Sequence, residues 1–446
     1  MTIPTIALQQ LHLMVAQLAG FAPPPRVAAL GSPGTVNVDL LLGAQLLWTV
    51  VMGRTSISYG DVDNWISLTE QGRSPHRFAG SSFGDDSEVS ADLSSMFSKL
   101  VGLAFLGEYA ETCWFKVLRP LWGETLSTVD GPVHIDKPNP HADGPDYLAA
   151  PFDPSSASLG GPFYAVEFKG RKAKVEFGSD VFRGWSAQAS NIALTSAASQ
   201  PLNLKSWVVA FNYGFAEARG SREASTLLVE DPEISPGASQ LRATRVNGAS
   251  IIRDHLARQC INLGVGVLAS AVKLGSGLDG ISHLPAVYRV DHQRLAQRRY
   301  IGHWYAPNAL GELVPVPRVS LPLGDFEFID RGPSHLRMMS KRGGIQVVIG
   351  SNAAEPHPRG PEDLLRRLWG LGGSIFVGQD ATMLRSAART QPDAALDTTP
   401  FIDELHFKET IGDGPGAGQI QVVRNGSIMA FNVPIELGED GFWSEP

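Results

Sequence analysis

The sequence has little cysteine. Cys113 and Cys260 are the two cysteines of a 446-residue chain, and they lie far apart, without the paired spacing of a zinc site or a thiol redox motif. This scarcity excludes a framework of several disulfides and gives no support to a zinc-binding module. We therefore expect a reducing environment, and a cytoplasmic location is the simplest interpretation.

Long hydrophobic runs are missing as well. Residues 1–20 lack the charged start and the uninterrupted apolar run of a secretory signal. Leu40–Gly53 is apolar but too short to cross a bilayer, and it contains Gln45, so it predicts a buried helix. Hydrophobic residues make up 43% of the chain and charged residues 18%, which argues against a disordered or fibrous protein. We expect a folded protein without a membrane partner.

The chain also lacks an overall positive charge, since its formal net charge is −8. Residues 240–345 are an exception, because they contain fourteen Lys and Arg against seven Asp and Glu. Such a segment can bind nucleic acid, since phosphate contacts need local positive charge. A solvated face rich in arginine explains the same composition equally well. Arg294, Arg298 and Arg299 are the candidate phosphate-binding residues of this segment.

The length predicts two or three domains. Residues 1–90 are expected to be an N-terminal helical region, with apolar stretches at 6–18 and 38–52 and a polar linker at 71–90. Residues 91–232 are expected to form an α/β domain. Residues 233–446 are expected to form a C-terminal α/β region that binds nucleic acid or a partner.

The central region begins with a predicted helix over 91–120 that stops at Pro120. Its apolar stripe contains Glu111, and Glu108 lies at the edge of the stripe, so we expect these carboxylates to have partners. The elements expected next are strands at 145–150 and 163–169, a helix at 179–194, and strands at 207–213 and 226–229. This order is typical of a small α/β layer domain.

The C-terminal region is expected to start with one long helix over 249–273. Strands are expected near 316–321 and 345–349. The segment QIQVVRNGSIMAFNV predicts a β-hairpin, with Asn425-Gly426 as a two-residue turn.

Two acidic residues and one lysine form the main chemical motif. Pro145-Asp146 is separated by twenty residues from Glu167-Phe168-Lys169. Because side chains alternate along a strand, Glu167 and Lys169 project from one face, and Asp146 can join them from the adjacent strand. Carboxylates are the ligands that magnesium prefers, and a nearby lysine can orient water beside a phosphate. The motif therefore predicts Mg²⁺- or Mn²⁺-dependent phosphodiester hydrolysis.

The motif is unique in the chain, since none of the other nine lysines has an acidic residue two positions earlier. A structural interpretation remains open, in which Glu167 and Lys169 form a solvent-facing ion pair and Asp146 caps a turn. Other candidates are weaker. His134 and His141 lack spaced carboxylates, and no Gly-x-Ser-x-Gly nucleophile motif is present.

Residues 100–215 resemble the PD-(D/E)XK nuclease superfamily, on the strength of Pro145-Asp146 and Glu167-x-Lys169. The resemblance implies a restriction-endonuclease-like core, a mixed sheet flanked by helices. It also implies that a Glu of the preceding helix completes the metal site. Gly107-Glu108-Tyr109-Ala110-Glu111 fits this pattern, with Glu111 as first choice and Glu108 as substitute. Gln188 occupies the place of a polar residue that often follows the lysine in this family.

The expected function is DNA cleavage, with defence against foreign DNA as a further expectation from the resemblance. Asp146, Glu167 and Glu111 are expected to hold the metal, and Lys169 to position water. Arg171, Lys172 and Lys174 directly follow the motif and are expected to contact the phosphate backbone, although a solvated hairpin tip explains them too.

Two alternatives stay open. The nuclease-like fold can act as an inactive scaffold that binds nucleic acid or a protein in a multi-subunit system, with or without self-association. The chemistry can also lie in the C-terminal region, with residues 100–215 as a structural part.

Overall fold

The computed structural model of the 446-residue chain is mixed α/β and contains several sheets. It describes residues 10–20, 25–30, 34–40, 42–43, 45–46, 87–110, 112–117, 123, 125–126, 132–151, 163–199, 201, 204–214, 225–231, 249–263, 265–279, 281, 284–307, 313–316, 326–332, 335–340, 346–350, 375–391, 407–412, 417–438 and 442–444.

The first large sheet has seven strands in the order β2-β1-β10-β9-β7-β6-β3. The pairs β1–β10 and β7–β9 are parallel and the other pairs are antiparallel, so the sheet is mixed. Its strands are β1 (Gln10–Gly20), β2 (Gly34–Asp39), β3 (Thr112–Val117), β6 (Tyr147–Pro151), β7 (Phe163–Arg171), β9 (Leu204–Asn212) and β10 (Thr226–Asp231).

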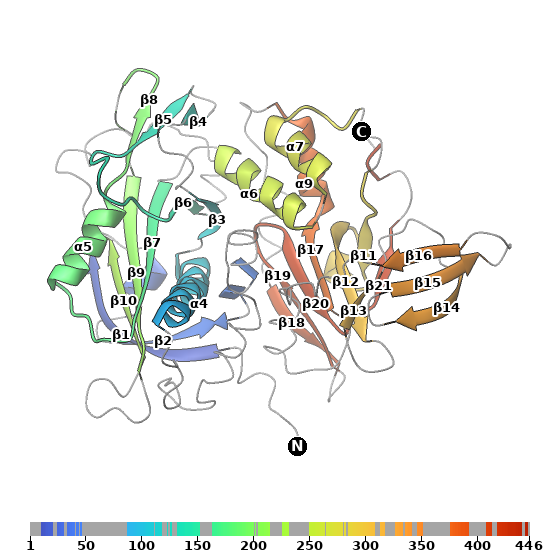
Figure 1. Cartoon of the computed structure of the whole chain (residues 1–446), viewed down its shortest axis with the longest axis horizontal. Helices are drawn as coiled ribbons and strands as arrows, with labels where there is room; N and C mark the ends of the chain where they lie inside the picture. Colours follow the sequence, from blue (N-terminus) through green and yellow to red (C-terminus); the bar gives the residue numbers. More distant parts are fainter. Residues whose placement is uncertain are drawn as a thin grey trace.

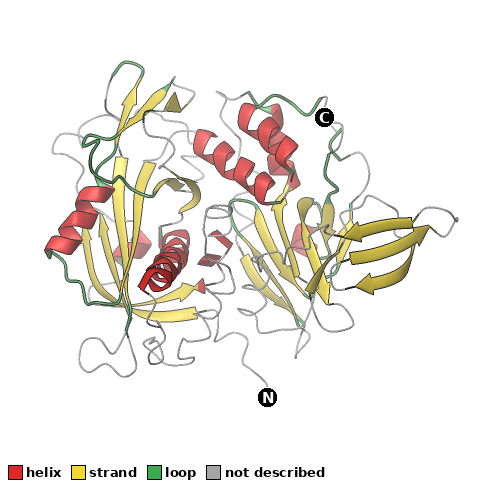
Figure 2. Ribbon diagram, in the orientation of Figure 1, coloured by secondary structure: helices red, strands yellow, loops and turns green. Residues whose placement is uncertain are grey.

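Two helices cover opposite faces of this sheet (Figures 1 and 2). Helix α4 (Ser87–Tyr109) packs on one face, where Gly102 lies so close to Phe168 that an added Cβ would overlap the ring. Helix α5 (Asp180–Ala189) packs on the other face through Phe182, Trp185 and Ala189. Ser179 caps its N-terminus by accepting a hydrogen bond from the backbone N–H of Phe182.

The second large sheet lies beside the first and has the order β18-β19-β20-β17-β12-β11-β21, with β13 paired to β12 (Figure 1). Its neighbouring strands are antiparallel. The strands are β11 (Tyr288–Val290), β12 (Tyr300–Pro307), β13 (Leu313–Val316), β17 (Ile375–Asp380), β18 (Phe407–Ile411), β19 (Gly418–Val422), β20 (Ser427–Phe431) and β21 (Ile435–Leu437).

Two small sheets and several short or peripheral elements complete the described fold. The small sheets have the orders β4-β5-β8 and β14-β15-β16. The remaining elements are α1 (Pro25–Ala28), β4 (Thr125–Leu126), β5 (Val133–Asp136), β8 (Ala193–Ser196), α6 (Ala249–Asn262), α7 (Gly266–Leu274), η4 (Gln293–Leu295), β14 (Phe326–Gly332), β15 (His335–Ser340), β16 (Gln346–Gly350) and α9 (Ala381–Arg389).

Helix α6 joins the two halves of the molecule, because it follows the first sheet in sequence and packs against β3 and β6 (Figure 1). His255 of α6 is fully buried, and its Nδ1 accepts a 3.4 Å hydrogen bond from the backbone N–H of Phe115 in β3. Its Nε2 lies 3.2 Å from Nδ2 of Asn425, in the turn after β19. Burial lowers the pKa of His255 to about 4, so the ring is neutral near pH 7.

The N-terminal prediction is wrong for two segments, because Gln10–Gly20 and Gly34–Asp39 are strands and not helices. In β1 the apolar residues Leu11, Leu13 and Val15 alternate with other residues, which is a strand period. A shift in register between Val15 and Gln17 then breaks the alternation. Both strands belong to the same sheet as β6 and β7.

The segment predicted to be a buried helix over 40–53 is described only in part. Residues 42–43 and 45–46 are helical and, like Leu40, buried. The remainder of this segment, and most of the predicted linker at 71–90, lie outside the described residues.

The predicted helices are shorter than expected. The helix over 91–120 ends at Tyr109, because the chain continues into β3, and the helix over 179–194 ends at Ala189, shortly before β8. The helix over 249–273 is divided into α6 and α7 near Leu263, where the sequence Gly264-Val265-Gly266 disfavours a continuous helix.

The expected hairpin is confirmed, but its loop is longer than two residues. The N–H of Gly426 donates to the carbonyl of Val423, and Gly426 has a φ of 78°, as in a three-residue loop. The strands expected at 145–150, 163–169, 207–213, 226–229 and 345–349 are confirmed, with shifts of a few residues at their ends. The strand expected near 316–321 lies outside the described residues beyond Val316, where β13 ends.

None of the helices in the described ranges is both long and apolar enough to cross a membrane.

Candidate functional site

The candidate site lies where β6 begins and β7 approaches its end. The two strands are antiparallel, with Tyr147 opposite Val166, so Asp146 stands at the level of Glu167. In the parallel pair β7–β9, Glu167 is opposite Val208 and Lys169 opposite Ala210. Since Val208 and Ala210 pack against α5, Glu167 and Lys169 project from the α5 face of the sheet.

The structure brings the three motif residues together. Glu167 is completely buried, and its Oε1 lies 2.5 Å from Nζ of Lys169. Its Oε2 accepts a 3.0 Å hydrogen bond from the backbone N–H of Asp146. Asp146 and Lys169 are both partly exposed, so the buried carboxylate lies beneath a charged, solvent-accessible rim. The alternative of a fully solvent-facing ion pair therefore does not describe Glu167.

Burial, followed by the nearby negative charge of Asp146, raises the pKa of Glu167 to about 8. The Lys169 ammonium and the hydrogen bond from Asp146 act in the opposite direction. A carboxyl group with this pKa keeps its proton at neutral pH unless another cation arrives. The site is therefore electrostatically suited to a positive ion beside Asp146 and Glu167.

The donor set fits a hard divalent cation, because two carboxylates are at the same level of adjacent strands. Mg²⁺ binds through one or two carboxylates and keeps several waters, so it needs no larger cage of side chains. Within the ranges that the structure describes, no group of three or more His, Cys, Asp and Glu residues could hold a metal ion. His134 and His141 are exposed.

Gln188 lies near this site but contacts the main chain. Its Nε2 donates a 3.1 Å hydrogen bond to the carbonyl of Gly144, two residues before Asp146. Gln188 thus holds the loop that leads into β6 instead of binding the carboxylates themselves.

Asn191 has a related role that sequence-based reasoning missed. Its Nδ2 donates to the carbonyls of Asn139, Ala142 and Asp143, at 2.9, 3.3 and 3.1 Å, and its Oδ1 accepts from the N–H of Asn139 at 2.8 Å. The side chain is buried. Its position near the end of a predicted helix is the only signal that the sequence offers.

Of the two helix carboxylates, only Glu108 is described, and it is not brought into this cluster. Glu111 lies outside the described residues. Glu108 is in α4, which packs on the face opposite to that of Glu167, and the charges that act on it come from Asp39, Arg26 and Lys408. Burial, and then Asp39, raises the pKa of Glu108.

The basic residues after the motif surround the end of β7. Arg171 is the last residue of β7, and Arg171, Lys172 and Lys174 are exposed. Lys174 forms an ion pair with Glu176. These residues are accessible to a polyanion next to the carboxylates.

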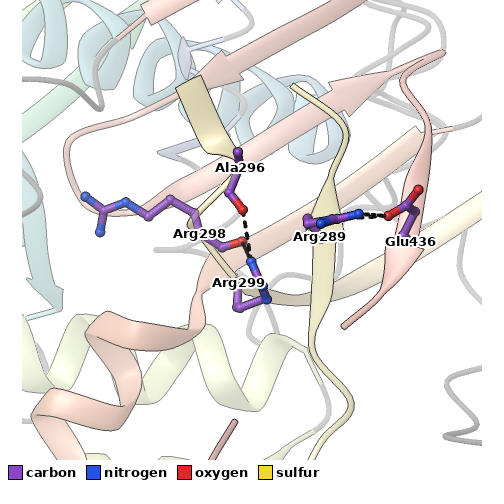
Figure 3. A network of polar contacts seen from close by, with 5 residues as sticks. All are labelled: Arg289, Ala296, Arg298, Arg299 and Glu436. Atoms are coloured by element: carbon purple, nitrogen blue, oxygen red, sulfur yellow. Dashed lines mark hydrogen bonds and ion pairs between the residues drawn. The ribbon is translucent and has the colours of Figure 1, made fainter. Parts of the chain in front are cut away.

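The three other candidate arginines lie between β11 and β12 in sequence, in the other half of the molecule. Figure 3 shows Arg298 and Arg299. Arg299 donates to the carbonyls of Ala296 and Arg298, both at 3.1 Å. Arg298 lies 3.8 Å from the buried Asp380, and Arg294 stacks on Phe407 at 4.1 Å. Asp380 and Phe407 are far along the chain from these arginines, so the local sequence gives no sign of the two contacts.

No protein-family model matches this chain, and neither a curated protein nor a solved structure matches it. Inferences about its activity therefore rest on its own residues.

Proposed function

We propose that this protein is a metal-dependent nuclease that hydrolyses phosphodiester bonds, with DNA as the substrate. The observation that carries the proposal is the convergence of Asp146, Glu167 and Lys169 where β6 begins and β7 ends. Two carboxylates and an ammonium group are the functional groups needed to hold a divalent ion and act on a phosphate beside it.

Asp146 and Glu167 would hold the ion, Mg²⁺ or Mn²⁺. A bound ion supplies an acidified water and neutralises charge on the phosphate. Lys169, with 27% of its side chain exposed, can leave the Glu167 carboxylate and donate hydrogen bonds to a water or a phosphate oxygen. Gln188 and Asn191 fix the loop before Asp146 and so act as positioning residues.

The buried position of Glu167 favours a particular order of events. Without a divalent ion, Lys169 is the cation paired with Glu167 among the described residues, and the carboxyl group keeps a raised pKa. With an ion held by Asp146 and Glu167, the Glu167 carboxyl group would carry no proton, and Lys169 would be available for the substrate. Glu167 would thus lose a proton and its pairing with Lys169 when the site holds an ion.

The test is cleavage by the purified full chain. Supercoiled plasmid, linear duplex, single-stranded DNA and RNA are incubated with Mg²⁺, Mn²⁺ or EDTA. Cleavage should require a divalent ion and should be lost in Asp146→Asn and Glu167→Gln. Glu436→Gln is a matched control, because Glu436 is also a strand carboxylate paired with a cation, Arg289, but lies in the other half (Figure 3).

Two results would contradict the nuclease proposal. If the parent chain binds nucleic acid but cuts none of the four substrates with either ion, the proposal fails, and the inactive scaffold is the better interpretation. Cleavage that persists in Glu167→Gln would place the chemistry elsewhere in the chain.

A further inference from the structure

Two cations that do not belong to the motif lie beside Tyr147, the residue after Asp146. The first is Lys99 of α4, whose Nζ is 5.8 Å from the centre of the Tyr147 ring. That ring is buried and contacts Phe115 and Phe168, so its position is fixed by packing. Lys99 is partly exposed, which leaves its ammonium group within reach of solvent.

The second cation is Arg258 of helix α6, which packs against β3 and β6 of the first sheet. Arg258 pairs with Asp254 one turn earlier, with 3.0 Å between Nε and Oδ2, and 24% of its side chain is exposed. Helix α6 is held against β3 by the contact of His255 with Phe115, and it also contacts β6. Arg258 therefore belongs to a helix that is held against β3 and β6, the strand that directly follows Asp146.

The charges that act on Tyr147 support a position of Arg258 near this residue. Burial is the main reason why the pKa of the Tyr147 hydroxyl is raised, and the charges of Asp146 and Glu167 raise it further. Arg258 acts on the same hydroxyl and lowers its pKa. The two carboxylates and Arg258 are therefore within electrostatic reach of one atom.

The cations at this end of the sheet flank the carboxylates. Arg171 ends β7 on the face of Glu167 and Lys169, and Lys172 follows it. Lys99 lies on the side of Tyr147, which points to the α4 face, and Arg258 acts on the same side chain. Asp146 stands between them, directly before β6. A nucleic-acid strand that crosses this end of the sheet meets positive charge before and after the carboxylates.

We propose that Lys99 and Arg258 bind backbone phosphates of the nucleic-acid substrate, so that the strand runs from the end of β7 past Asp146 to α6. The inference rests on the proposed nuclease function and extends it, because it assigns substrate binding to α6 in the C-terminal half. It adds Arg258 to Arg294, Arg298 and Arg299 as a candidate phosphate-binding residue of that half. Asp254 then orients Arg258 toward the phosphate.

The test measures binding of the full chain to a short fluorescent DNA duplex and to its single strand, in EDTA and over a series of KCl concentrations. For each phosphate that a variant no longer neutralises, the slope of log Kd against log salt should fall by about 0.9 for duplex and about 0.7 for single-stranded DNA. Lys99→Gln and Arg258→Gln are expected to show this fall, whereas Lys99→Arg and Arg258→Lys should keep the parental slope.

Lys273→Gln is the matched control, since it also removes one exposed positive charge but lies at the end of α7. Its slope should equal that of the parent. Thermal unfolding separates a binding role from a structural one, because a purely structural role lowers the Tm and leaves the slope unchanged. Lys99→Gln alone can decide the matter if Arg258→Gln does not fold.

The outcomes separate this inference from the proposed function. If the parent binds and cuts DNA but neither Lys99→Gln nor Arg258→Gln changes the slope, the substrate takes another path, and the nuclease proposal stands. If the parent neither binds nor cuts any nucleic acid, both proposals are wrong.

Discussion

The backbone N–H of Asp146 donates a 3.0 Å hydrogen bond to the buried carboxylate of Glu167 on the neighbouring strand. The bond makes the position of Asp146 dependent on the protonation and partners of Glu167. A change at Glu167 therefore affects both carboxylates of the candidate site. The effects on activity of substitutions at Asp146 and at Glu167 should not be additive.

Replacement of Lys169 by Ala should abolish most of the cleavage. The variant loses the only ammonium group that contacts Glu167 in the described structure, and a transition-state donor of this kind contributes about 10²–10³-fold in rate. Single-turnover cleavage of plasmid DNA at saturating Mg²⁺ measures the loss. Binding of DNA in EDTA should change little, and Lys273→Ala should cut at the parental rate. A parental rate in Lys169→Ala would refute the role given to Lys169.

Glu167 should make stability depend on pH in the absence of metal. Its pKa is raised from 4.5 to about 8 on folding, so the folded state holds a proton that the unfolded state releases. Its contribution is fully present below pH 4.5 and is lost as the pH rises toward about 8. Urea unfolding in EDTA across this range should show a fall in the free energy of unfolding that is smaller in Glu167→Gln. An equal fall in both proteins would contradict the assignment.

Addition of Mn²⁺ or Mg²⁺ should stabilise the parent protein, because a ligand that binds only the folded state raises the Tm. The apparent affinity should increase with pH up to about 8, since the ion competes with the proton on Glu167. Thermal unfolding with and without the ion measures both effects. Asp146→Asn and Glu167→Gln should lose the metal-dependent rise in Tm, whereas Glu436→Gln should keep it. A rise of the same size in all four proteins would show that the ion binds elsewhere.

Replacement of Asn191 by Ala should loosen the loop at 139–143. The buried amide donates to three carbonyls, and a backbone group left without its partner costs about 1–3 kcal/mol. We expect a loss of this size in urea unfolding, together with slower cleavage. Gln188→Ala removes one bond from a partly exposed side chain and should cost less, about 1 kcal/mol. The reverse order of the two variants would contradict the positioning role of Asn191.

The part of the site that could be predicted from sequence is the part that depends on local pattern. Alternation along Phe163–Arg171 places Glu167 and Lys169 on one face, and the apolar runs identify β6, β9 and β10. The convergence of Asp146 with Glu167 follows from the pairing of two strands that are close in sequence.

The rest depends on contacts between distant segments. Thr112–Val117 continues the apolar pattern of α4, and its strand conformation is set by pairing with β6. The partners of Arg298 and Arg294 are Asp380 and Phe407, which belong to much later strands. No local pattern predicts these two contacts.

His255 and its helix α6 cover the edge of the first sheet. β3 is the last strand of its sheet, and the N–H groups on the outer side of such a strand can pair with another polypeptide. Nδ1 of His255 accepts a hydrogen bond from the N–H of Phe115, and α6 packs against the same edge strand. A protein shortened to end before Ala249 would leave this border bare, and its molecules would tend to join edge to edge into aggregates.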